Sequence, residues 1–261
     1  MDLNPDNTRA KEGLSLALIK YNQDIANKNI INLIPAKKAP PELYKLVKSN
    51  FALKYKDTLD KTYEILDFLW VDENGKILLT QIMKNKIPIQ ITHGKANTNA
   101  KTEETTMRQT FIQYGGFPSF TMDIEQDKKI TVNIGEEIIQ LYKNPSSSFN
   151  QNMYAIMAVM HEFGHAAASI VEEKHNNSLE EELTVSMIGY NSASKVLTGK
   201  LLTKEESISY AKRTFKSLMS DDHKNLPLYN DFEKTISKLG ITLYNYDTYS
   251  DFYGLQQETL Q

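Results

Sequence analysis

Two histidines lie one helical turn apart in the most hydrophobic segment of the chain, AIMAVMHEFGHAAASIV, residues 155–171. On an α-helix, residues i and i+4 lie on the same face, so His161 and His165 can direct two imidazoles at one ion. Glu162 is rotated by about 100° from His161 and can therefore act beside the ion instead of binding it. This H-E-x-x-H spacing is typical of two zinc ligands and a general base that acts on a zinc-bound water.

The residues around the motif favour this chemistry. Methionine, isoleucine and valine precede it, and alanine, isoleucine and valine follow it. A helix that is apolar on several sides is a buried helix. Burying two histidines and a carboxylate is costly unless each has a partner, and one divalent cation is a partner that all three can share.

A catalytic zinc site needs a third protein ligand and an open coordination position. Ala168 and Val171 occupy the positions where the longer motif H-E-x-x-H-x-x-G-x-x-H requires glycine and histidine. Glu172 would lie about 10 Å beyond His165 along a continuous helix. We therefore predict the third ligand in the acidic run at 180–182, which opens the next helix.

Helical phase distinguishes the three acidic residues of this run. Glu182 shares its face with small and apolar residues suited to close packing on another helix: Leu179, Val185, Ser186, Gly189, Ala193 and Val196. We predict Glu182 as the third ligand and Glu181 as the alternative. Acidic residues in the first turn of a helix also interact favourably with the helix dipole, which would explain the run without a metal.

At these residues the chain resembles the zincin superfamily of zinc metallopeptidases, in which HEFGH is a common form of the motif. A downstream glutamate ligand is similar to the gluzincin branch, although the familiar E-N-x-x-x-D continuation is absent. The resemblance implies an α+β fold in which a small twisted sheet covers the active-site helix and a mainly helical C-terminal lobe follows. It also implies that one Zn²⁺ is the cofactor, that Glu162 is catalytic, and that the substrate is a protein or peptide.

We therefore expect a selective zinc endopeptidase of a bacterial effector-like or regulatory kind. The alternative is a non-catalytic binding or sensing module that retains a zincin-like fold. The oxyanion formed during peptide hydrolysis needs a donor besides the metal. The candidate donors, none of which belongs to a motif, are Tyr190, His223, Tyr246, Tyr249 and Tyr253.

Composition narrows the remaining function classes. The net charge of −3 over 261 residues gives no reason to expect nucleic acid or an anionic membrane as a partner. The chain has no cysteine, which excludes disulfides, thiolate zinc ligands and cysteine nucleophiles. No segment approaches the roughly 18 apolar residues of a membrane helix, and no signal peptide is visible. We expect a soluble protein that is cytoplasmic or exported without a signal.

Hydrophobic periodicity predicts a mixed first half and a helical second half. In the first half we expect helices over 8–28 and 39–55, a β-hairpin over 67–82 that turns at Asn74 and Gly75, strands at 87–93 and 128–134, and a polar loop at 94–109. The predicted later helices are 150–174, 178–198, 203–221 and 228–239. We expect an N-terminal region, 1–108, for substrate recognition and a catalytic region, 109–261, or one continuous domain.

Overall fold

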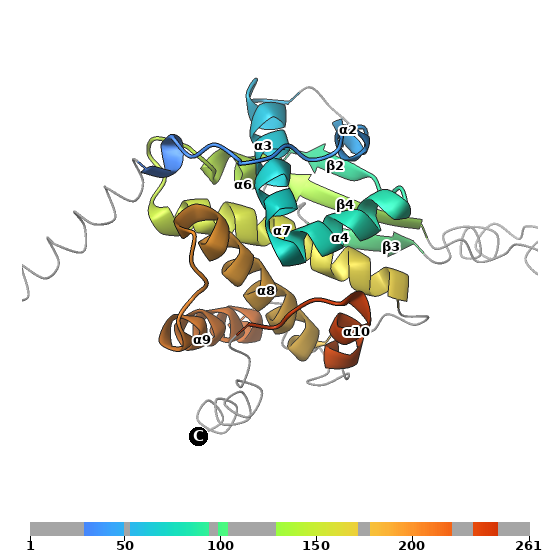
Figure 1. Cartoon of the computed structure of the whole chain (residues 1–261), viewed down its shortest axis with the longest axis vertical. Coiled ribbons are helices and arrows are strands. Elements are labelled where there is room, and N and C mark those ends of the chain that lie inside the picture. Colours follow the sequence, from blue (N-terminus) through green and yellow to red (C-terminus); the bar gives the residue numbers. More distant parts are fainter. Residues whose placement is uncertain are drawn as a thin grey trace, which may run out of the picture.

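The chain forms a mostly helical α/β arrangement with one small sheet (Figure 1). A computed structural model describes residues 29–49, 53–93, 99–103, 129–171, 178–220 and 232–244. The elements in the first half are α2 (Pro41–Tyr44), β1 (Val47–Ser49), α3 (Thr58–Val71), α4 (Glu73–Lys84), β2 (Ile89–Thr92) and β3 (Asn99–Glu103). The later elements are β4 (Lys129–Gly135), α6 (Glu136–Leu141), α7 (Phe149–Val171), α8 (Leu179–Thr198), α9 (Lys204–Ser220) and α10 (Phe232–Leu239).

The sheet has the strand order β1-β2-β4-β3. Strands β1, β2 and β4 are parallel, and β3 runs antiparallel to β4 at one edge. The predicted strands at 87–93 and 128–134 are confirmed as β2 and β4. Strand β4 lies between two neighbours, so its backbone groups are paired on both sides. The predicted boundary at residue 108 lies outside the described residues, and the sheet combines strands from both sides of it.

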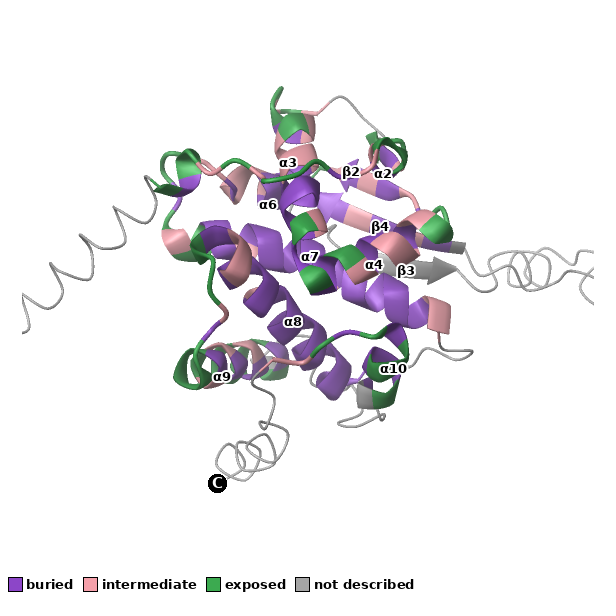
Figure 2. Ribbon diagram, viewed as in Figure 1, coloured by how far each residue is buried: buried purple, intermediate pink, exposed green. Residues whose placement is uncertain are grey.

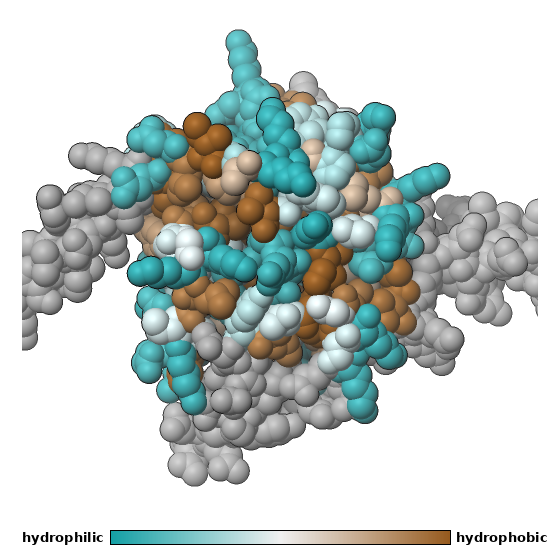
Figure 3. All heavy atoms as spheres, in the orientation of Figure 1, coloured by the Kyte–Doolittle hydropathy of each residue, from teal (hydrophilic) through white to brown (hydrophobic). Residues whose placement is uncertain are grey.

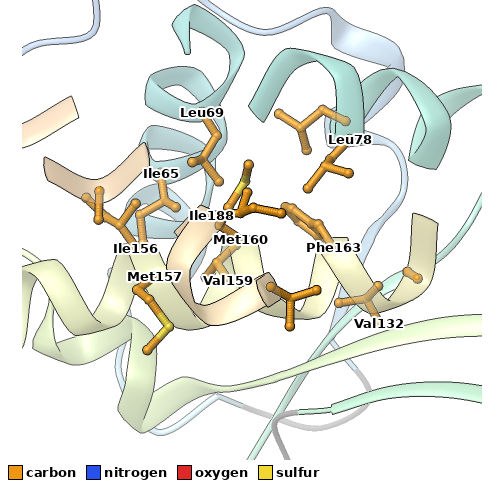
Figure 4. Close-up of a cluster of buried hydrophobic side chains, with 14 of the residues drawn as sticks. Ile65, Leu69, Leu78, Val132, Ile156, Met157, Val159, Met160, Phe163 and Ile188 are labelled. Atoms are coloured by element: carbon orange, nitrogen blue, oxygen red, sulfur yellow. The ribbon is translucent and has the colours of Figure 1, made fainter. Parts of the chain in front are cut away.

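Helix α7 is the centre of the hydrophobic core. It contacts β3, β4, α4, α6 and α8. Met160 and Phe163 are fully buried and lie among core side chains that include Leu69 of α3 and Leu78 of α4 (Figure 4). Helices α7 and α8 are buried along most of their lengths (Figure 2). The two histidines of α7 lie against the first two turns of α8.

The β-hairpin predicted over 67–82 is wrong, because these residues form the end of α3 and most of α4. Asp72 separates the two helices, and its carboxylate accepts a hydrogen bond from the Gly75 amide at 2.9 Å as the N-cap of α4. A Cβ on Gly75 would lie 2.2 Å from the carbonyl oxygen of Leu69. The glycine therefore permits a close approach between two helices and does not mark a hairpin turn.

Other predicted elements have mixed outcomes. The helix predicted over 39–55 is wrong, because α2 ends at Tyr44 and the chain enters β1 at Val47. Part of the predicted polar loop at 94–109 is strand β3, and the helix predicted over 8–28 lies outside the described residues. The four helices predicted from residue 150 onward are confirmed as α7, α8, α9 and α10, whose described ends agree with the prediction within a few residues. Thr203 and Glu206 form a capping box at the start of α9, with bonds of 2.9 and 3.2 Å.

The surface seen in Figure 3 alternates between hydrophobic and hydrophilic areas. The large hydrophobic side chains that the described part of the chain exposes are Ile31, Ile34, Val71 and Met219. Among the described helices, none combines the length and hydropathy that a membrane crossing requires.

Candidate metal centre

Two glycines allow α7 and α8 to pack closely. A Cβ on Gly164 would lie 2.8 Å from Cγ1 of Val185, and a Cβ on Gly189 would lie 2.8 Å from the carbonyl oxygen of Met157. These two contacts also show that the helices are antiparallel, because the later residue of α7 meets the earlier residue of α8. The packing therefore brings the first turns of α8 beside the histidines of α7.

His161, His165 and Glu182 form a group in which one ligand atom from each residue lies within 4.8 Å of the others. The two Nε2 atoms are 3.0 Å apart. Nε2 of His161 lies 3.3 Å from Oε2 of Glu182, and Nε2 of His165 lies 3.4 Å from Oε1 of Glu182. Tetrahedral zinc with bonds of about 2.0–2.1 Å places neighbouring ligand atoms about 3.3 Å apart. The donor set and its spacing therefore fit a zinc ion.

The remaining ring nitrogen of each histidine also has a partner. Nδ1 of His165 lies 2.6 Å from Oε1 of Glu181, and Nδ1 of His161 lies 3.0 Å from Oγ of Ser186. A carboxylate only accepts, so Nδ1 of His165 carries a proton, and Nε2 is the ring nitrogen that faces the other two ligand atoms. Metal-binding histidines usually donate their second nitrogen in this way.

Glu181, the alternative third ligand in the sequence prediction, therefore lies outside the three converging ligand atoms. It occupies the opposite side of the His165 ring. The sequence prediction names Ser186 only as a packing residue. Its position four residues after Glu182, on the same helical face, is the signal that could have placed it beside the metal site.

The group is buried, and its charges perturb one another. His165 and Glu182 are each 7% exposed, and Glu181 is fully buried. Burial disfavours the protonated imidazole of His165, but the carboxylates of Glu182 and Glu181 outweigh burial and hold its pKa well above the ordinary value. Burial acts to raise the pKa of Glu182, but the two histidines lower it well below its usual range. The site thus stabilises positive charge at its centre.

Glu162, the predicted general base, follows His161 directly and is 8% exposed. Burial, and then the charge of Glu162, raise the pKa of Tyr154. Tyr154 lies earlier on α7 and was not singled out by the sequence. It carries no motif, but it lies about two turns before Glu162 on the same helix, which brings the two groups within electrostatic range.

Tyr190 is the predicted oxyanion donor that lies within the described residues, and its described stacking and hydrogen-bond partners are on α9. The ring of Tyr190 stacks on Tyr210 of α9, with ring centroids 4.4 Å apart. Burial raises the pKa of Tyr190, and a hydrogen bond with Thr214 acts in the opposite direction. The other candidates lie outside the described residues: His223, Tyr246, Tyr249 and Tyr253.

No protein-family model, curated protein or solved structure matches this chain. The geometry of the described residues gives a candidate metal site with three ligands from two helices.

Proposed function

We propose that this chain is a zinc-dependent metallopeptidase that hydrolyses peptide bonds of a protein substrate. The observation that carries the proposal is the buried convergence of His161, His165 and Glu182, with Glu162 next to the first histidine. Three protein ligands leave one position of a tetrahedral zinc open, as in catalytic sites and unlike structural sites.

The residues of the site have distinct roles in this reaction. A bound Zn²⁺ would lower the pKa of a water molecule and polarise the carbonyl group of the substrate. Glu162 accepts the proton that the attacking water loses and delivers it to the leaving amine. Its position on the same helix as both histidines keeps it within one turn of both predicted ligands.

The sheet supports a peptide as the substrate. Strand β3 forms one edge of the sheet, and within the described residues it pairs only with β4. An extended peptide can add to such an edge through backbone hydrogen bonds. Strand β3 also contacts α7, the helix that carries the motif (Figure 1).

These features also support a zincin-like fold. A small sheet with an antiparallel edge strand packs on the motif helix, and a helical part that contains the glutamate follows. Fold alone does not establish activity. Selectivity for one protein substrate, of an effector-like or regulatory kind, remains a prediction from the sequence.

The substitution Glu162→Gln tests the proposal. Zinc content and cleavage of a mixed peptide library are measured on the full chain loaded with zinc, for the wild type and the variant. We expect the variant to retain one zinc and to lose at least about 100-fold in cleavage rate, because the general base is removed. Glu205→Gln, at an exposed position of α9, is the matched control and should cleave at the wild-type rate.

Two results would contradict the proposal. Cleavage by Glu162→Gln at the wild-type rate would show that another group is the base or that a contaminant is responsible. A zinc-loaded wild type that cleaves no peptide in the library would favour the non-catalytic binding or sensing module instead.

A further inference from the structure

The ring of His165 lies between two consecutive acidic residues. Oε1 of Glu181 lies 2.6 Å from Nδ1, and Oε1 of Glu182 lies 3.4 Å from Nε2. Neighbouring residues of a helix point about 100° apart, which allows Glu181 and Glu182 to approach the ring from two sides. Two consecutive glutamates in the first turn of α8 therefore contact different ring nitrogens of the same histidine.

We infer that Glu181 is a positioning residue of the metal site, which holds the His165 ring in the orientation and tautomer that present Nε2 to a metal. The inference rests on the proposed zinc site. In this role Glu181 strengthens metal binding through His165 and does not itself bind the metal.

The local structure fixes Glu181 for this role. Ser178 is the N-cap of α8, and its hydroxyl accepts a hydrogen bond from the Glu181 amide at 3.1 Å. The Glu181 side chain is fully buried. A buried carboxylate anchored in a capped first turn has few alternative conformations, so its bond to Nδ1 restricts the rotation of the imidazole.

The second histidine provides an internal comparison. Nδ1 of His161 faces the hydroxyl of Ser186 at 3.0 Å, which can either donate or accept. The hydroxyl therefore does not select one tautomer of His161. A charge-assisted hydrogen bond is roughly twice as strong as a neutral one. Glu181 should consequently affect metal binding more than Ser186 does.

Five variants of the full chain separate these roles: Glu181→Gln, Glu181→Ala, Ser186→Ala, Glu182→Gln, which changes a predicted ligand, and Glu180→Gln. The last is the matched control, because it removes the same charge from the preceding residue of the same helical turn. Zinc affinity is measured by competition with a chromophoric chelator. The visible absorption spectrum of the Co²⁺-loaded protein reports the ligand field, and circular dichroism reports the fold.

We expect Glu181→Gln to weaken zinc binding by about 10- to 100-fold and to shift the Co²⁺ absorption bands, with an unchanged fold. Glu181→Ala, which also removes the hydrogen-bond acceptor, should weaken zinc binding further. Ser186→Ala should weaken zinc binding less than Glu181→Gln does. Glu180→Gln should bind zinc within about twofold of the wild type, since the carboxylates that the structure places on the His165 ring are those of Glu181 and Glu182. Glu181→Gln is nearly isosteric, so it keeps the test decisive if the alanine variant does not fold.

Two results would overturn the inference. Wild-type affinity and an unshifted Co²⁺ spectrum in both Glu181 variants would show that this carboxylate does not act on the metal. A loss in Glu181→Gln equal to that in Glu182→Gln would show that Glu181 is itself a ligand. Failure of the proposed function looks different, because the wild type itself would then bind no zinc or cleave no peptide.

Discussion

Nε2 of His161 lies 3.0 Å from Nε2 of His165, and each lies within 3.4 Å of a carboxylate oxygen of Glu182. Two imidazole nitrogens at this separation repel each other if both present lone pairs, so a proton or a cation must lie between them. The raised pKa of His165 indicates that a proton fills this role when no metal is bound. Protons and zinc therefore compete for the same nitrogens.

This competition predicts the pH dependence of zinc binding. Since the pKa of His165 is raised in the metal-free fold, zinc must displace a proton at any pH below that raised value. We expect the apparent zinc affinity to rise by up to about tenfold per pH unit through the neutral range and to level off above the raised pKa. Chelator competition at several pH values measures the apparent zinc affinity. An affinity that does not change from pH 6 to 8 would contradict this prediction.

Zinc should also stabilise the fold. A ligand that binds only the folded state adds about 2.7 kcal/mol at a free concentration 100 times its Kd. We expect the Tm to rise with zinc, and to rise more at pH 8 than at pH 6. The proton on His165 stabilises the metal-free fold below about pH 6.5, and this contribution is lost as the pH rises through the raised pKa.

His165→Ala is the control for the thermal measurement. It removes a ligand, so its Tm should not respond to zinc at the concentrations that saturate the wild type. An equal zinc-dependent rise in this variant would place the stabilising ion elsewhere in the protein.

The contact between α7 and α8 predicts different outcomes at its two glycines. Gly164→Ala should weaken zinc binding, because the new Cβ displaces the side chain of Val185, one turn from Glu182. Adding Val185→Ala should restore much of the zinc affinity.

At Gly189 the obstacle is the backbone oxygen of Met157, so Gly189→Ala should destabilise the fold by about 1–3 kcal/mol. Chelator competition and urea unfolding measure the two effects, and wild-type values in both single variants would refute the packing.

Asp72 links α4 to α8 away from the metal site. It is 4% exposed, caps α4 through the Gly75 amide, and accepts a hydrogen bond from Ser192 at 2.8 Å. Asp72→Ala should lower the free energy of unfolding by about 2–4 kcal/mol, because a cap is lost and a buried hydroxyl loses its acceptor. The folded variant should still bind one zinc.

The neighbouring residue provides the comparison for Asp72. The side chain of Glu73 is 74% exposed, so Glu73→Ala should change stability by about 0.5 kcal/mol or less. Similar losses in the two variants would contradict the role assigned to Asp72.

The sequence predicts the motif helix well, because both its periodicity and its chemistry are local. It also directs attention to Glu182, because Val185 and Gly189 on the same face are small enough for close packing. The structure places these two residues against Gly164 and Met157 of α7. The roles of Glu181 and Ser186 depend on how two helices are rotated against each other, which a single sequence does not specify.

The errors in the first half have a common physical cause. Hydrophobic runs around Asn74 and Gly75 resemble a hairpin locally, but tertiary packing selects two helices, and the glycine serves their contact at Leu69. Strand β3, with the sequence NAKTE, has no apolar alternation. It becomes a strand because β4 offers a free edge, and that information lies outside the segment itself.

The most direct measurement of the central claim is X-ray absorption at the zinc edge of the zinc-loaded full chain, compared with His161→Ala and Glu182→Ala. We expect one zinc with two imidazole nitrogens at about 2.0–2.1 Å and carboxylate oxygen at about 2.0–2.2 Å, and loss of this signature in both variants. A zinc shell without imidazole, or the same shell in the variants as in the wild type, would contradict it.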